Sequence, residues 1–235
     1  MRATAALRSD IRFQWRHGFY GAYLFVCTLY VLLLQFVPEE YQDRVAALLT
    51  FSDPSALGLL FAGGIILLER GQGIYDSLLT TPLRTAEYLI GKVASLAILS
   101  IGSAWLIHGL SAGVPEFPLR FTVGVGLTSA LFTLLGIGVA VRSRSLNGFI
   151  MMTQLYAVVL VLPLLMVFKV WDSALLFVFP TMGSLLLMDA VLRPVEVWEV
   201  GYSVFILIMG ITLIWMWAYR SFEHYIRQKL GGGAE

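Results

Sequence analysis

Long stretches with almost no charge constrain this chain more than any other feature of its sequence. A helix needs about 20 apolar residues to cross the hydrocarbon core of a bilayer, which is about 30 Å thick. Six segments approach that length: residues 18–37, 52–68, 94–110, 121–141, 148–168 and 200–219. One globular core cannot enclose so many apolar residues, so much of their surface must face lipid. The sequence therefore predicts an all-α integral membrane protein with six spans.

The composition excludes the main alternatives. Of 235 residues, 58% are hydrophobic and 13% are charged, whereas soluble domains average about 45–50% apolar and about 25% charged residues. The single cysteine, Cys27, excludes a disulfide-rich secreted domain. The formal net charge of +1 gives no sign of a nucleic-acid partner, and we expect none.

The distribution of Lys and Arg predicts the orientation, because cytoplasmic loops carry an excess of both. Twelve of the 16 basic residues fall on one side of the expected spans: Arg2, Arg8, Arg12, Arg16, Arg70, Arg84, Lys92, Arg142, Arg144, Arg220, Arg227 and Lys229. We therefore expect a multi-pass protein of the cytoplasmic membrane with both termini, including the tail 220–235, in the cytoplasm.

Two prolines suggest local features of the spans. Asp53 and Pro54 are expected to begin the second span, because Pro is tolerated in a first helical turn and Asp can cap it. Pro163 is expected to kink the fifth span.

Residues 1–17 predict an amphipathic helix that lies in the cytoplasmic headgroup layer. Leu7, Ile11 and Trp15 recur at helical spacing, and Arg8, Arg12 and Arg16 follow one position later. Anionic membrane lipid attracts such a basic face. The alternative is an ordinary basic flank that happens to be helical.

The connection between the second and third expected spans predicts a short helix with an apolar face. Glycines at 71 and 73 loosen the chain, and Pro82 ends the helix. Its apolar face would comprise Ile74, Tyr75, Leu78 and Leu79. Such a face needs a cover, which is either lipid or a groove in a soluble partner.

Glu69 stands at the membrane boundary before this connection. Its possible partners are Arg70, Lys92 or an arginine of the amino-terminal helix. The alternative is a solvated carboxylate at a helix end.

Residues 169–199 form a long connection on the outer side, and residues 174–187 are apolar but too short to span. They predict a re-entrant hairpin that is broken around Pro180, Met182 and Gly183.

Catalytic chemistry is not evident. The sequence contains no GxxxxGK[ST] phosphate-binding loop, no metal-ligand spacing among its three histidines, and no intramembrane protease motif. We therefore expect a non-enzyme with no catalytic residue, no metal and no cofactor of its own. His108 is the only imidazole in a span, with a substrate or proton role as the alternative to a structural one.

Several motifs, taken in order, resemble the ABC-2 type transporter permeases, and most closely the small bacterial permeases of fluoroquinolone or multidrug export. They are Asp10-Ile11-Arg12, Arg16-His17-Gly18-Phe19-Tyr20, Asp53-Pro54, Gly63-Gly64, Glu69-Arg70, Leu78-Leu79-Thr80-Thr81-Pro82-Leu83, Tyr88-Leu89 and Gly91-Lys92. Gly71-Gln72-Gly73 departs from the Gly-Thr of many relatives, which leaves the start of the following helix open.

The resemblance implies a permease that pairs with a second copy of itself or with a related permease. Two copies of a separate ATP-binding cassette subunit would bind ATP and Mg and drive it. Residues 71–82 would be the coupling helix that docks on that subunit through Glu69, Arg70, Gly73, Ile74, Tyr75, Leu78, Leu79 and Pro82. Arg8, Arg12, Trp15 and Arg16 would belong to the connecting helix.

The expected function is export of amphipathic or apolar, drug-like compounds. Candidate cavity residues are Phe61 and Leu67 in the second span, and Met152, Gln154 and Tyr156 in the fifth. The alternatives are export of haem, a peptide or a lipid-linked glycan, or a membrane scaffold for an ATPase that transports nothing.

Overall fold

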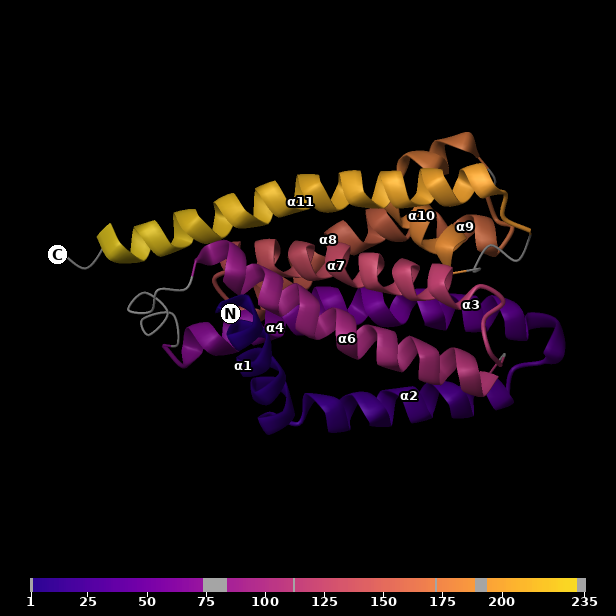
Figure 1. Cartoon of the computed structure of the whole chain (residues 1–235), viewed down its shortest axis with the longest axis horizontal. Helices are drawn as coiled ribbons and strands as arrows, with labels where there is room; N and C mark the ends of the chain where they lie inside the picture. The colour runs from indigo at the N-terminus through magenta and orange to yellow at the C-terminus, as the bar shows by residue number, and fades with distance from the viewer. Residues whose placement is uncertain (1, 74–83, 112, 172, 189–193, 232–235) are drawn as a thin grey trace.

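The computed structural model describes residues 2–73, 84–111, 113–171, 173–188 and 194–231. Within these residues every regular element is a helix. The helices form an elongated bundle, and both chain termini lie toward the same end of it (Figure 1). In chain order the elements are α1 (Arg2–Arg16), α2 (Phe19–Gln35), α3 (Glu39–Ala56), the π-helical turn η1 (Leu57–Phe61), α4 (Ala62–Gly71), α6 (Thr85–Ser111), α7 (Pro118–Arg142), α8 (Leu146–Val161), α9 (Leu164–Val167), the 3-10 helix η2 (Ala174–Val178), α10 (Pro180–Leu187) and α11 (Val197–Gly231).

Four stretches of the described chain are long and apolar enough to cross a membrane. They are Glu39–Gly71, Thr85–Leu110, Pro118–Arg142 and Val197–Tyr225. The pair Thr4–Arg16 and Phe19–Gln35, bent by 67°, adds a fifth if it counts as one broken span. α8 has 16 residues, and that length rises only about 24 Å. The chain is thus an all-helical, multi-pass membrane protein, and the layout of six spans stays a prediction.

The expectation that Asp53 caps a helix and that Pro54 stands in its first turn is wrong. α3 begins at Glu39, directly after Pro38, and continues through both residues into η1 and α4. Asp53 is only 2% exposed. A carboxylate that finds hydrogen-bond donors inside the bundle needs no water, so Asp53 can lie in the interior of a helix.

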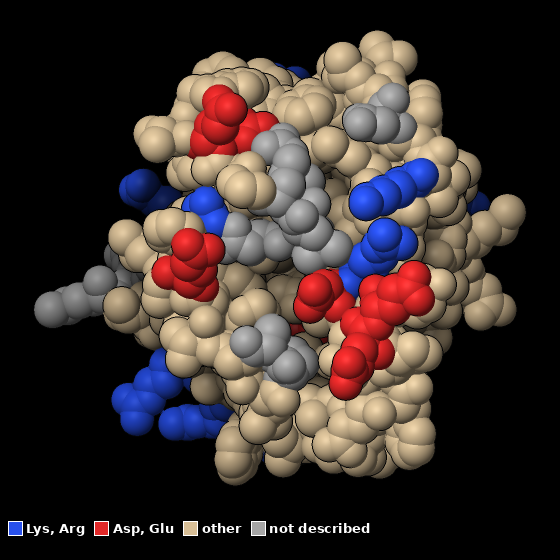
Figure 2. Space-filling view, turned by 90° about the vertical axis from the view of Figure 1, so that its right-hand side faces the viewer, with Lys and Arg blue, Asp and Glu red and all other residues tan. Residues whose placement is uncertain are grey.

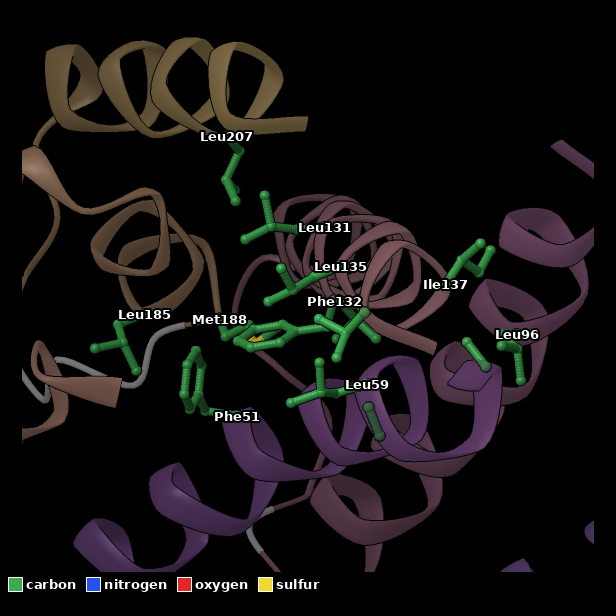
Figure 3. Packing of buried hydrophobic residues seen from close by; sticks show 14 of the residues in the cluster. Phe51, Leu59, Leu96, Leu131, Phe132, Leu135, Ile137, Leu185, Met188 and Leu207 are labelled. Atoms are coloured by element: carbon green, nitrogen blue, oxygen red, sulfur yellow. The ribbon is translucent and has the colours of Figure 1, made fainter. Parts of the chain in front are cut away.

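α7 is the central helix, and the main hydrophobic core surrounds it. Leu131 points toward Leu207 of α11, and Phe132 lies beside Phe51 of α3 (Figure 3). The two phenylalanine rings meet edge to face, with their centroids 6.3 Å apart. From Leu131 to Val141 every residue of α7 is buried, so neighbouring helices enclose its second half on all sides.

Two glycines allow η1 to cross α7 with their backbones in contact. A Cβ atom on Gly136 would lie 2.4 Å from the carbonyl oxygen of Leu59, and one on Gly58 would lie 2.7 Å from the backbone nitrogen of Thr133. Backbone atoms cannot move aside as a flexible side chain can. The crossing therefore requires residues without a side chain at both positions, as is common where membrane helices pack closely.

The prediction for Pro163 is confirmed, because α8 ends at Val161 and α9 begins at Leu164. The predicted break around Pro180, Met182 and Gly183 is confirmed at Pro180, because η2 ends at Val178 and Pro180 begins α10 after the extended Phe179, whereas Met182 and Gly183 lie inside α10. Proline fits the first turn of a helix. Gly183 lets α10 pack closely against α11, because a Cβ atom on Gly183 would lie 2.8 Å from the carbonyl oxygen of Ser203. The re-entrant hairpin itself stays a prediction.

The end of the bundle away from the termini carries many acidic side chains. Figure 2 shows that face, on which acidic residues gather in several groups with basic residues between and beside them. Acidic residues also stand in the first turns of α3 and α11, Glu39, Glu40 and Glu199. There they complement the positive end of the helix dipole.

Gly136→Ala should destabilise the bundle by about 1–3 kcal/mol, because the new methyl group must push η1 away from α7. The matched control is Gly126→Ala in the same helix, whose methyl group would meet only Cδ1 of Ile101, at 3.6 Å. Thermal unfolding of the purified protein in detergent measures both variants. Equal stability of the two variants would contradict the backbone contact.

Candidate functional site

Lys92 lies between two carboxylates inside the protein. Its Nζ atom donates hydrogen bonds to Oδ1 of Asp10 and, at 2.6 Å, to Oε1 of Glu69. Lys92, Asp10 and Glu69 are only 2%, 6% and 5% exposed. They come from α6, α1 and α4, so the contact joins three separate helices. Asp10, Glu69 and Lys92 are called the ionic junction below.

Three uncharged donors complete the ionic junction. Tyr88 donates its hydroxyl proton to Oε2 of Glu69, and Ser95 donates to Oδ2 of Asp10. Nε2 of Gln14 lies 3.0 Å from the same Oδ2 atom and 2.9 Å from Oγ of Ser95. All four carboxylate oxygens therefore accept a hydrogen bond. That satisfaction is what allows two carboxylates to stay buried beside a single ammonium group.

The periodicity of two helices brings these groups together. Tyr88, Lys92 and Ser95 follow at i, i+4 and i+7 on one face of α6, and Asp10 and Gln14 follow at i and i+4 on α1. Gly91 lets the two helices approach, because a Cβ atom there would lie 3.1 Å from Cβ of Ala6. The Tyr88 ring also packs on Phe222 of α11, with 5.1 Å between centroids.

Arg70, the neighbour of Glu69, points to the other side of α4. Its Nη1 donates to the carbonyl oxygen of Ser143 at 2.7 Å, and its Nη2 donates to that of Val141 at 2.8 Å. The guanidinium also lies 4.5 Å from the centre of the Tyr225 ring. Arg70 thus satisfies carbonyl groups that the end of α7 leaves without partners, and its charge complements the negative end of that helix.

Only part of the predicted coupling segment is described. Glu69 takes Lys92 as its partner, one of the three that the sequence left open, and it is not a solvated carboxylate. Arg70 contacts α7 and does not pair with Glu69. Gly73 has a positive φ of 67°, which glycine adopts readily. The other predicted contact residues, Ile74, Tyr75, Leu78, Leu79 and Pro82, lie outside the described residues.

The predicted amino-terminal helix exists as α1, and its arginines at 8, 12 and 16 are exposed. Trp15 is 74% exposed, with its ring 5.6 Å from that of Tyr20. The side of α1 that faces the bundle carries Asp10 and Gln14. A position in the headgroup layer stays a prediction for the exposed side.

The structure of the single chain does not bring the five predicted cavity residues together. Phe61 packs edge to face on Phe19 and Tyr23 of α2, and Leu67 is half-buried in α4. On α8, Tyr156 lies 6.2 Å from Trp217 of α11, measured between ring centroids. The remaining two, Met152 and Gln154, are exposed.

Sequence reasoning missed the burial of a carboxylate outside the ionic junction, that of Asp53. It accepts hydrogen bonds from the hydroxyl groups of Tyr23 and, at 2.7 Å, Ser103. It is also the only Asp, Glu, Lys or Arg within the six expected spans. That isolation is the signal that could have found it, since ionisable groups inside a membrane need internal partners.

Comparison with known proteins decides the family. The model of the fluoroquinolones export permease protein family matches residues 1–230. The chain belongs to this family. Two similar permeases, both called fluoroquinolones export permease protein, come from Mycobacterium tuberculosis strains CDC 1551 / Oshkosh and ATCC 25618 / H37Rv. Each is 26% identical over 233 residues, which is 98% of this chain and 98% of the relative. Membership of a permease family indicates a transport subunit, as the resemblance predicted.

Lys92→Met should destabilise the permease by about 3–5 kcal/mol, because it leaves two carboxylates buried without their counter-ion. Adding Asp10→Asn and Glu69→Gln should recover much of that loss, since the triple variant buries no charge. Lys169→Met, at an exposed lysine, is the control. Denaturant unfolding in detergent measures the free energies, and a triple variant less stable than Lys92→Met would contradict the ionic junction.

Proposed function

We propose that this chain is the ABC-2 type permease subunit of an ATP-binding cassette exporter. Two copies of a separate subunit bind ATP and Mg, and the permease acts as a homodimer or with a related permease. The family match over residues 1–230 supports this proposal. So do the apolar helices, several of which are long enough to cross a membrane.

The ionic junction is the observation that carries the proposal. α4 ends at Gly71 and α6 begins at Thr85, so the two helices flank the segment expected to dock on the ATP-binding subunit. Glu69 lies near the end of one helix and Lys92 near the start of the other. Their contact ties both helices to each other, and Asp10 ties them to α1.

This arrangement suits the transmission of force. ATP-driven closure of the partner subunits would press on residues 71–82. A buried network in which all four carboxylate oxygens accept hydrogen bonds resists shear, because separating its charges would leave them without partners in a low dielectric. α1, α4 and α6 then move as one body, and their rigid-body motion opens the transport path toward the outside.

The same account sets the class of substrate. Asp53 already receives two hydrogen bonds within the bundle, so the expected spans offer little charge with which to bind an ion. We therefore propose amphipathic or apolar drug-like compounds as cargo. The names of the two mycobacterial relatives make fluoroquinolones the first compounds to test.

Leu78→Arg should abolish co-purification of the ATP-binding subunit while the permease still inserts into the membrane, because a charge would enter an apolar docking face. Leu119→Arg is the matched control, since Leu119 is 78% exposed in the first turn of α7, toward the other end of the bundle. Affinity purification from membranes with quantification of both subunits gives the readout.

If the ATP-binding subunit still co-purified with the Leu78→Arg variant, the assignment of residues 71–82 as the coupling helix would be wrong. The scaffold alternative is tested in the same material. In proteoliposomes, ATP hydrolysis that a fluoroquinolone stimulates favours export, whereas hydrolysis that no compound in a drug panel changes favours a scaffold.

A further inference from the structure

A second group of positive charges lies apart from the ionic junction. At the end of α7 the surface contains a pocket of about 460 Å³. Arg142 and Arg144 line it from one side, and Arg220 and His224 line it from α11. Arg70, already bound to the last carbonyls of α7, forms part of its wall.

Arg70, Arg142, Arg144, Arg220 and His224 are called the basic pocket below. Within the described residues no carboxylate forms an ion pair with Arg142, Arg144 or Arg220. Glu223 is close in sequence, but it does not line the pocket. Like charges that lie close together repel one another, so an anion in this pocket would relieve the repulsion.

An apolar stripe runs along α11 from the rim of the basic pocket. Phe205, Met209, Leu213 and Met216 are all exposed, and their spacing places them on the same face as Arg220. From Arg220 the stripe rises about 16 Å to Met209 and about 22 Å to Phe205, so it covers the roughly 15 Å of hydrocarbon in one leaflet. Most of α11 is not buried within the chain.

We propose that the basic pocket binds the phosphate of an anionic phospholipid, whose acyl chains lie along the stripe on α11. A cationic site at a helix end followed by one leaflet's length of apolar surface matches the shape of a lipid. A soluble partner could meet the arginines but would not need the stripe. The proposal depends only on α7 and α11 being membrane helices, and not on the identity of the exporter or its cargo.

The test measures retained lipid on the purified permease by native mass spectrometry. The detergent-solubilised protein is titrated with phosphatidylglycerol, with phosphatidylcholine or with inorganic phosphate. Arg144→Gln with Arg220→Gln should weaken phosphatidylglycerol binding about 30-fold, since each basic residue near anionic lipid contributes about 1 kcal/mol and every 1.4 kcal/mol is about tenfold in affinity. Arg84→Gln with Lys169→Gln removes the same charge at two exposed positions outside both the pocket and α1, and should leave binding within twofold.

Retention of phosphatidylcholine and an unchanged thermal midpoint show that the pocket variant is folded. An equal loss of phosphatidylglycerol binding in the two double variants would overturn the proposal, because it would indicate that the lipid is attracted to any basic surface. The proposal would also be overturned if inorganic phosphate, at a concentration similar to that of phosphatidylglycerol, displaced the lipid. The pocket would then be a site for a free anion. The proposal would be overturned as well if the pocket variant bound lipid unchanged but no longer bound the ATP-binding subunit. The pocket would then be a contact for that protein.

Discussion

The burial of Lys92 between Asp10 and Glu69 is the interaction on which the arrangement of the helices at this end of the bundle depends. Removing three charges from water costs several kcal/mol for each ion, and the cost is offset only when the charged atoms find hydrogen-bond partners. Tyr88, Ser95 and Gln14 supply those partners. Because the donors and acceptors come from α1, α4 and α6, none of these helices can shift alone without exposing an unsatisfied charge.

α7 complements this polar contact with an apolar one. Its buried half packs on α3, η1, α10 and α11, and Gly136 lets a neighbouring backbone approach within van der Waals contact. Arg70 links the two systems, since it leaves α4 beside Glu69 and binds the last carbonyl groups of α7. A displacement at the end of α4 therefore reaches both α1 and the central helix.

Sequence alone predicted the helical membrane architecture, because long apolar runs have few other solutions. It placed Glu69 and Lys92 correctly as possible partners. It misread Asp53 as a helix start, since the sequence does not show that Tyr23 and Ser103 satisfy its carboxylate inside the bundle. It named Asp10 only within a family motif and did not single out Gln14, because the arginines beside them dominate α1 and only packing shows which face of that helix meets the bundle.

The central claim is that α1 and α6 move as one body when the partner subunits close on ATP. Spin labels at Arg8 and Ile90, both exposed, report the distance between these helices by pulsed electron resonance in the assembled complex. The account predicts the same distance distribution without nucleotide and after trapping with ATP and vanadate. Lys92→Met should broaden that distribution in the trapped state. In the protein that keeps Lys92, a clear change of the distance between the two labels on trapping would contradict the claim.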